Sequence, residues 1–456
     1  MPPGRSRPPS PRLADELADS EGEGGESLDG TVEMPGNHGR VISVADVWRL
    51  ALVQRETKRG VHTAAIGANV TTFLEGHPWW AGVVQYDEFH ELVVTTRVPP
   101  WDREDMPVGA AAGAWTDDDS ARLRAWFSRV EGIDFPLPEI EAGLQVAAQR
   151  HRFHPVRAYL RGLEWDGVPR IDTWLSDLVG ADDTPYARAV GSRWLVSAVA
   201  RIMRPGCQVD CMLVLEGAQG TGKTSTWRSL VPVREWYSDT PLDLATKDAL
   251  DALRGVWIVG LDELDSLRKG ELTRVKTYIS QTRDRYRRPY GHRHVDFERQ
   301  NVFCGTTNEA EYLVDRTGNR RFWPVRVGGP IEWGRVAALR DQLWAEALSR
   351  FDSGESWHVN TPALRRLCEA EQSSRAIPDP WTGLVRTWIE GPVERMAYRN
   401  GVTTADVLEQ CLGVRRADVE VRHSMRVASC LRELGFVRER LGRDWVYVRP
   451  ADPADA

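Results

Sequence analysis

An eight-residue run, Gly217-Ala218-Gln219-Gly220-Thr221-Gly222-Lys223-Thr224, constrains the fold more than any other part of the sequence. It matches the phosphate-binding pattern G-x-x-x-x-G-K-[ST] at every fixed position. The glycines let the backbone curl so that successive N–H groups face phosphate oxygens. The pattern predicts that Lys223 reaches the β- and γ-phosphates of ATP and that the Thr224 hydroxyl holds Mg²⁺. We expect this run and the adjoining Ser225 to bind the nucleotide.

The flanking residues distinguish this interpretation from a chance glycine-rich turn. A short apolar run from Cys211 to Leu215 precedes the loop, as expected of a buried parallel strand. Ser225 to Leu230 can continue as a helix, whose N-terminus favours an anion. Strand, loop and helix together favour a P-loop domain of the α/β class with a parallel sheet.

Composition describes an ordinary globular chain with no global attraction for nucleic acid. The 456 residues carry a formal net charge of -7, so local patches would have to decide any DNA binding. The 19 tryptophans are attributed to core packing, and the six scattered cysteines to reduced thiols. No apolar run reaches membrane-spanning length and the N-terminus lacks an apolar signal core, so the sequence predicts a cytoplasmic protein without a membrane partner.

Changes in composition divide the chain into segments of different expected structure. These are a disordered tail (1–40), a small α+β module (41–150), a helical lead-in (151–205), the P-loop ATPase core (206–330), a helical segment and linker (331–380), a winged-helix-like module (381–450) and a short tail (451–456). The winged-helix expectation rests on a helix, a second helix and a hairpin that follow one another between Thr404 and Val448.

Two acidic residues end the next apolar run after the loop. Val256 to Leu261 reads as a strand and is followed by Asp262 and Glu263. An acid at the tip of the strand that neighbours the loop can hold Mg²⁺, and a second acid can polarise the attacking water. We assign Asp262 to the metal, together with Thr224, and Glu263 to the water. The alternative is a polar strand end that enters a turn.

A polar strand tip and an arginine pair follow further along the chain. Asn308 ends a third expected strand and can orient the lytic water or contact the γ-phosphate, although Thr-Thr-Asn is also ordinary turn chemistry. Arg320 and Arg321 follow a glycine turn. An arginine from a neighbouring subunit can stabilise the transferring phosphoryl group. The alternative is a pair of surface salt-bridging arginines.

A basic segment lies between the acidic strand and the Asn308 strand. Arg283 to His294 holds five arginines, one acid and two tyrosines, which suits phosphate contacts and base stacking along DNA. Pro289 to Gly291 can form the tip of a hairpin. The expected DNA contacts are Arg285, Arg287, Arg288, Tyr290, His292 and Arg293. The alternatives are a solvated basic loop, or arginines that serve the ATP of a neighbouring subunit.

Several short motifs together resemble one known family. They are His154–Leu160, Trp165–Arg170, Leu215–Gly220, Lys247–Ala249, Arg287–Tyr290, Gly305–Asn308 and Gly318–Val325. In this order they resemble the virulence-associated protein E family of phages and integrated genomic islands, over roughly residues 150–330. That family is similar to superfamily 3 helicases, the ring-forming AAA+ motors of viral and phage replication.

The resemblance implies a role for each group of site residues. Lys223 and Thr224 match the first motif, Asp262 and Glu263 the second, Asn308 the sensor, and Arg320 or Arg321 the finger. The basic segment matches a DNA-gripping hairpin. One departure is visible, because the family pattern often has an acid where this chain has Gly260 and a small residue where it has Asp262. Of the two acids, Glu263 therefore matches the family pattern more closely than Asp262.

The sequence thus predicts an ATP-hydrolysing DNA motor, a replicative helicase or DNA-remodelling ATPase of a phage or integrated mobile element. Its expected cofactors are ATP and Mg²⁺. Its expected partners are single-stranded or forked DNA, further copies of itself in a hexameric ring, and phage or host replication proteins. Two alternatives remain open. One is a P-loop phosphotransferase acting on a small molecule, and the other is an ATP-switched regulatory or interference protein that binds DNA or replication partners without unwinding.

Overall fold

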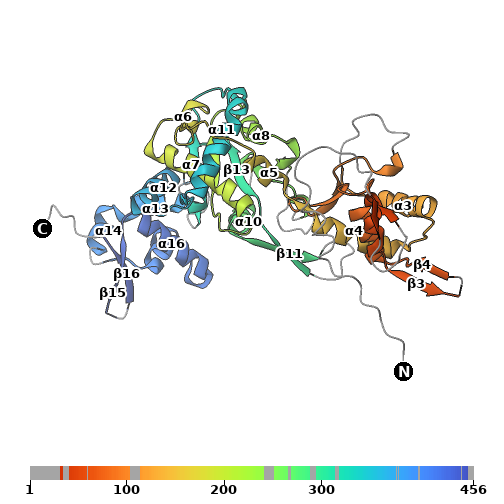
Figure 1. Cartoon of the computed structure of the whole chain (residues 1–456). Coiled ribbons are helices and arrows are strands. Elements are labelled where there is room, and N and C mark those ends of the chain that lie inside the picture. The colour runs from red at the N-terminus through yellow and green to blue at the C-terminus, as the bar shows by residue number, and fades with distance from the viewer. Residues whose placement is uncertain are drawn as a thin grey trace.

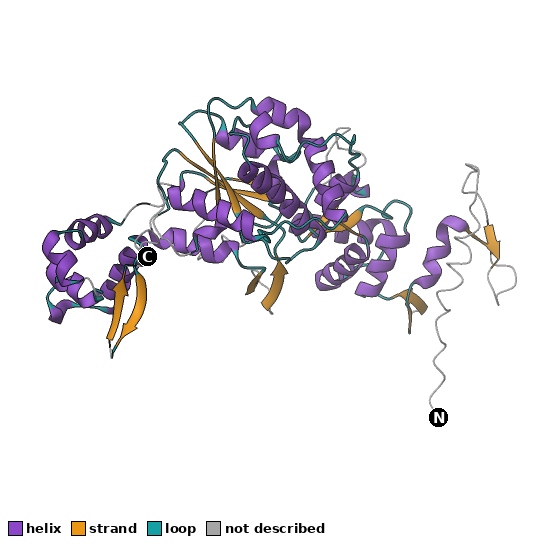
Figure 2. Ribbon diagram, turned by 90° about the vertical axis from the view of Figure 1, so that its left-hand side faces the viewer, coloured by secondary structure: helices purple, strands orange, loops and turns teal. Residues whose placement is uncertain are grey.

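The computed structural model describes residues 31–33, 41–58, 60–102, 113–240, 251–264, 269–287, 294–313, 318–375, 377, 379–398, 401–442 and 444–449. Separate apolar cores occupy an N-terminal, a central and a C-terminal region. Both views place the N-terminal and C-terminal regions on opposite sides of the central one (Figures 1 and 2). Among the described residues, no helix is long and apolar enough to cross a membrane.

The central region is built on a five-stranded parallel sheet, which confirms the predicted α/β class. Its order is β14 (Phe322–Arg326), β8 (Met212–Glu216), β13 (Val302–Thr307), β10 (Ile258–Leu261) and β9 (Tyr237–Ser238). The loop strand β8 pairs with β13, and β13 pairs with the acidic strand β10. The expectation that the acidic strand neighbours the loop strand is therefore wrong. The inserted strand carries Asn308 at its end, so this side chain lies between the loop and the acids.

Helices cover both faces of the sheet because its strands are apolar on both sides. Leu213 and Leu215 of β8 belong to the cluster that includes α7 (Pro185–Met203), α8 (Lys223–Ser229) and α11 (Trp333–Asp352). Met212 and Val214, which alternate with them, belong to the cluster that includes α10 (Lys269–Ile279). Shorter helices complete the region: α5 (Pro155–Arg161), α6 (Trp174–Asp177) and α12 (Pro362–Ser374).

Buried tryptophans tie these helices to the sheet. Six of the largest fully buried side chains are Trp174, Trp194, Trp227, Trp257, Trp323 and Trp344, all in the central region. Trp194 donates its indole N–H to the Phe303 carbonyl at 2.8 Å, and Trp227 donates to Gly305 at 3.2 Å. Trp194 and Trp227 thus each bury a large apolar ring and satisfy its one donor. For these residues the core-packing interpretation of the tryptophans is confirmed.

A buried carboxylate on α11 holds the loop that precedes α6. Glu346 is fully buried and accepts hydrogen bonds from the backbone N–H groups of Arg170 (2.6 Å) and Ile171 (3.0 Å). Its other oxygen accepts from Arg350 at 2.6 Å. We expect Glu346→Ala to lower the free energy of unfolding by about 3–5 kcal/mol, because the substitution leaves the backbone N–H groups of Arg170 and Ile171 without an acceptor.

Urea denaturation measures this effect, and Asp352→Ala is the matched control on the same helix. Asp352 forms an exposed pair with Arg161, and such pairs contribute less than about 1 kcal/mol. A loss for Glu346→Ala no larger than that of the control would contradict the assignment.

The N-terminal region combines helices with small sheets. Its elements are β1 (Thr31–Glu33), β2 (Val41–Ser43), η1 (Val44–Ala51), β3 (Gln54–Thr57), β4 (Gly60–Thr63), α2 (Gly67–Gly76), β5 (Val84–Asp87), β6 (Leu92–Thr95), α3 (Asp117–Trp126), η3 (Phe127–Glu131), α4 (Leu137–Arg150) and β7 (Arg152–Phe153). Strand β1 pairs with β2, so the expected disorder of residues 1–40 is wrong for residues 31–33. The remainder of that tail, like residues 451–456, lies outside the described residues.

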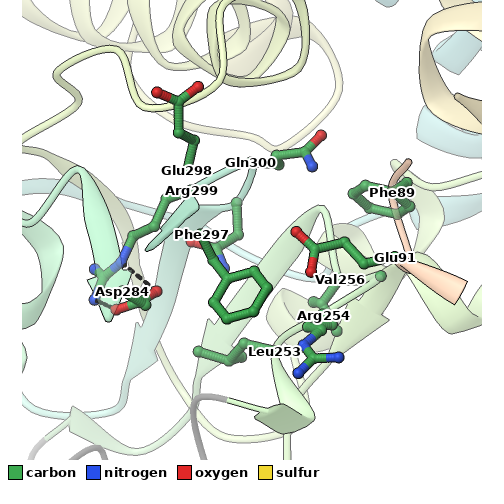
Figure 3. A pocket seen from close by; sticks show the side chains of 12 residues that line it. Phe89, Glu91, Leu253, Arg254, Val256, Asp284, Phe297, Glu298, Arg299 and Gln300 are labelled. Carbon is green, nitrogen blue, oxygen red and sulfur yellow. Dashed lines mark hydrogen bonds and ion pairs between the residues drawn. The ribbon is translucent and has the colours of Figure 1, made fainter. Parts of the chain in front are cut away.

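The turn between β5 and β6 of the N-terminal region packs against the central region (Figure 3). Phe89 in this turn is buried in the central core, and its carbonyl accepts from the Gly255 N–H at 3.2 Å. Figure 3 shows Phe89 and Glu91 facing Arg254 and Phe297 across a cavity of about 40 Å³. That volume holds about one water molecule, so the junction is a packing contact and not a ligand site.

The C-terminal region contains the expected order of two helices and a hairpin. It begins with α13 (Pro380–Ile389) and α14 (Pro392–Ala397), followed by α15 (Thr404–Asp406) with η7 (Val407–Cys411), α16 (Val421–Glu433), β15 (Val437–Leu441) and β16 (Asp444–Val448). The hairpin strands pair in antiparallel register. Four arginines of this region pair with acids: Arg415 with Asp418, Arg416 with Glu409, Arg422 with Glu420 and Arg426 with Asp379. Its surface is therefore less basic than its arginine content indicates.

Candidate nucleotide-binding site

The glycine-rich run forms the connection between β8 and α8, as the sequence predicts. Gly220 and Gly222 have φ angles of 80° and 93°, which residues with a side chain rarely adopt. Lys223 is buried and donates from Nζ to the carbonyls of Gly217 (2.7 Å) and Ala218 (2.8 Å). It also donates to Asn308 Oδ1 at 3.1 Å. The loop lysine and the tip of β13 are thus in direct contact.

The residues assigned to a metal lie together. Thr224 Oγ1 donates to Asp262 Oδ2 at 3.1 Å, and Thr306 Oγ1 donates to the other Asp262 oxygen at 3.0 Å. Neighbouring oxygens around an octahedral Mg²⁺ lie about 3 Å apart when each is about 2.1 Å from the ion. The Thr224–Asp262 separation therefore fits two side chains that could hold one Mg²⁺.

Glu263 has an unusual backbone. Its φ angle of 54° lies in the left-handed region, which costs a residue with a side chain of order 1 kcal/mol. Its N–H donates to Thr306 Oγ1 at 3.4 Å, the same hydroxyl that contacts Asp262. Strained backbone at the end of a sheet strand is frequent at functional sites. This observation supports a functional role for the carboxylate independently of the sequence pattern.

An open cavity of about 310 Å³ unites these groups. Its lining comprises Gln219, Gly220, Thr221, Gly222, Lys223, Thr224, Ser225, Asp262, Glu263, Thr306 and Asn308. The volume is at the lower end of the range for small-molecule sites. The structure therefore brings most of the predicted loop residues, both acids and Asn308 into one site. Thr306, which bridges the acids, was not predicted, since a threonine before a turn carries no distinctive pattern.

Tyr237 explains the departure from the family pattern at Gly260. A Cβ at Gly260 would lie 2.3 Å from the Tyr237 hydroxyl, so the ring on β9 occupies the space of a side chain at 260. Burial raises the pKa of Tyr237 well above its usual value, so the phenol stays neutral beside the acids. An acid at position 260 is therefore sterically excluded, and Asp262 is the carboxylate that reaches Thr224.

This packing predicts the outcome of a substitution. We expect Gly260→Ala to lower the free energy of unfolding by about 1–3 kcal/mol, because the new methyl group overlaps the Tyr237 hydroxyl. In a Tyr237→Phe background the loss should shrink, since the closest atom is gone. Urea denaturation of both single variants and the double variant measures the coupling. Equal losses in the two backgrounds would contradict the steric explanation.

Arg320 and Arg321 lie at the opposite edge of the sheet from the loop. They belong to η6 (Asn319–Arg321) immediately before β14, and Phe322 pairs with Met212 at the start of β8. Five strand residues at about 3.3 Å each put roughly 16 Å between this point and Gly217. Arg320 is exposed, and Arg321 donates to Ser280 Oγ at 2.6 Å. Neither arginine is placed to reach the loop of its own chain.

Two further arginines border the loop and were not predicted. Arg375, at the end of α12, pairs with Glu216 at 2.8 Å, the residue directly before the loop. Exposed Arg326 ends β14. Both line a cavity of about 480 Å³ with Gly217, Ala218 and Asn308. The sequence carried no signal for Arg375, because a lone arginine far along the chain acquires its position only through the packing of α12.

The basic segment includes a hairpin with a largely neutral base. Strands β11 (Arg283–Arg287) and β12 (His294–Glu298) pair in antiparallel register and project from the sheet (Figures 1 and 2). Arg283 pairs with Glu298 at 3.1 Å, and Arg285 pairs with Asp296 at 3.5 Å. Both pairs are exposed and therefore weak, so the arginines remain able to exchange partners.

Of the other expected DNA contacts, Arg287 lies within the described residues by its backbone alone. The remaining contacts expected at the tip lie outside the described residues: Arg288, Tyr290, His292 and Arg293. The Lys247–Ala249 motif also lies outside them.

Strand, glycine loop and helix within a parallel sheet define a P-loop domain of the α/β class. Residues 160–377 match the model of the virulence-associated protein E-like domain, so this part of the chain carries that domain. The family resemblance drawn from the motifs is thus confirmed.

The chain is also similar to solved structures of the NrS-1 C-terminal region. The apo structure of residues 305–718 shares 14% identity at a TM-score of 0.43, covering 80% of this chain and 94% of that one. Its A form gives the same identity and TM-score, with 95% of that chain covered. Structural similarity at this identity and TM-score supports no conclusion about activity. A comparison with curated proteins found no match.

Proposed function

We propose that this chain is an ATP-hydrolysing motor that moves along or remodels DNA during replication of a phage or an integrated mobile element. The observation that carries the proposal is the meeting of Lys223, Thr224, Asp262 and Asn308 in one site. A cation, a hydroxyl–carboxylate pair and a strand-end amide are the parts that phosphoryl transfer from a nucleotide requires. A small-molecule phosphotransferase is less favoured, because an arginine pair far from the loop of its own chain fits a site shared between subunits better than one closed within a single chain.

Each residue of the site has a separate role in ATP hydrolysis. Lys223 balances negative charge on the β- and γ-phosphates, and Asn308 holds both the lysine and the γ-phosphate end in position. Glu263 accepts a proton from the water whose oxygen attacks the γ-phosphorus, while the bond to the ADP oxygen breaks. Thr224 and Asp262 would hold Mg²⁺, which would supply positive charge to stabilise the negative charge that develops on the phosphate oxygens.

The arginine pair implies a shared site. Since Arg320 and Arg321 lie at the far edge of their own sheet, they can act on ATP only in another copy of the chain. Such a head-to-tail arrangement generates a ring when the rotation closes, which supports a homo-oligomer of the hexameric kind. The β11–β12 hairpin and its tip are the proposed DNA contact, with phage or host replication proteins as further partners.

A second candidate is an ATP-switched regulator that binds DNA or replication proteins without unwinding. The ion pairs at Arg283, Arg285 and the C-terminal arginines favour it, because they reduce the free positive charge available to a DNA strand.

Displacement of a labelled strand from forked DNA by the full chain, with ATP and Mg²⁺, separates the two candidates. The motor proposal predicts displacement by the wild type and none by Lys223→Ala. Lys223-dependent ATP hydrolysis without strand displacement on any fork would leave only the switch.

A further inference from the structure

Trp333 is an exposed tryptophan beside the glycine loop. It is the first residue of α11, and 51% of it is exposed, whereas the core tryptophans are fully buried. A Cβ built on Gly222 would lie 3.5 Å from Trp333 Cδ1, so the indole borders the loop at the residue directly before Lys223. The Ile331 N–H donates to the Thr221 carbonyl at 2.8 Å and ties the segment before Trp333 to the loop.

The order of the sheet places Trp333 at one end of the site. The groups suited to Mg²⁺ and the γ-phosphate, Asp262 and Asn308, come from β10 and β13, on one side of the loop strand β8. Strand β14 lies on the other side of β8, and the chain runs from it to Trp333. A nucleotide whose terminal phosphate faces Asn308 therefore extends its nucleoside toward the β14 side.

We propose that the Trp333 indole stacks on the base of the bound nucleotide. This proposal rests on the proposed function only in requiring that the ligand be a nucleoside triphosphate. Gly329 and Gly334 have open space where a Cβ would point, so the surface around the ring is not filled at these two positions. Nearby Glu332 and Arg335 are exposed and lie 3.7 Å apart. The base is thus held by its face, which every base offers, rather than by buried hydrogen bonds to its edge.

Calorimetric titration with two ligands tests this assignment in the full chain. One is a non-hydrolysable ATP analogue with Mg²⁺, and the other is inorganic tripolyphosphate with Mg²⁺, which lacks a base. Trp333→Ala should weaken binding of the analogue by about 5- to 100-fold, the range for loss of one base–aromatic stack, and leave tripolyphosphate binding unchanged. Trp333→Phe should keep most of the affinity. Trp445→Ala is the control, because Trp445 is equally exposed at 51% but lies in the C-terminal hairpin.

The possible outcomes separate this inference from the proposed function. If Trp333→Ala weakens the binding of both ligands equally, Trp333 acts on the shape of the loop and not on the base. If it weakens the binding of neither ligand, Trp333 does not contact the nucleotide. A smaller oligomer with unchanged analogue affinity would assign the ring to a subunit contact. Each of these overturns the inference while nucleotide binding by the wild type stands. A wild type that binds neither ligand overturns the proposed function as well.

Discussion

Lys223→Ala is expected to reduce the rate of ATP hydrolysis by about 10²–10³-fold, the effect of removing one preorganised electrostatic contact to the transition state. Lys223 is the only basic side chain among the described residues that line the loop cavity. Its loss removes that cavity's basic side chain, so the charge that develops on the phosphates is less well stabilised. Phosphate release at saturating Mg²⁺ and ATP measures the effect.

Two controls make this result interpretable. The thermal unfolding midpoint of Lys223→Ala reports whether the loop still folds, since the ammonium also donates to Gly217 and Ala218. Asp352→Ala, far from the loop on α11, should hydrolyse ATP like the wild type. A folded Lys223→Ala protein that retains a third or more of the wild-type rate would place hydrolysis elsewhere.

Loss of both Arg320 and Arg321 is expected to slow hydrolysis by about 10³-fold or more, the lower bound for removal of an arginine finger. The double alanine variant still has an intact loop, and Lys223→Ala subunits still have intact arginines. The two features lie at opposite ends of the strands. In the proposed ring, mixing the variants would therefore create interfaces at which one intact loop meets one intact arginine pair. We expect mixing to restore part of the rate.

Single substitutions of Arg320 and of Arg321 then show which of the two arginines acts on the neighbouring subunit's ATP. Arg320 is exposed, whereas Arg321 is held by Ser280, so Ser280→Ala should release only Arg321 and disturb only an Arg321-dependent rate. A mixture that stays as inactive as each variant alone would contradict a subunit-shared site.

The local chemistry of the site was predictable from the sequence because it resides in short contiguous patterns. The loop from Gly217 to Thr224 needs left-handed glycines and a lysine at fixed spacing, and both recur in the structure. Asp262 and Glu263 were predictable because a short apolar run that ends in acids defines a strand and its tip.

What the sequence did not reveal depends on the order of strands and on distant packing. Nothing in the linear pattern indicates that β13 inserts between β8 and β10, although this order brings Asn308 to Lys223. Tyr237 is distant from Gly260 along the chain, and only the pairing of β9 with β10 places its hydroxyl over that glycine. The packing of α11 and α12, which follow the last strand of the sheet, likewise brings Trp333 and Arg375 next to the loop.

The ion pairs of Arg283 and Arg285 could not be predicted from the sequence for a related reason. Five arginines within Arg283–His294 read as a basic patch, but the acids that pair with two of them lie on the partner strand. Antiparallel pairing brings Asp296 and Glu298 opposite Arg285 and Arg283, a register that composition alone does not contain.

The most direct test of the proposed DNA motor is the steady-state rate of ATP hydrolysis by the full chain with and without saturating single-stranded DNA. A motor of this kind should hydrolyse ATP at a rate that depends on Lys223 and rises when DNA is added. A Lys223-dependent rate that single-stranded, forked and duplex DNA all leave unchanged would contradict the DNA motor.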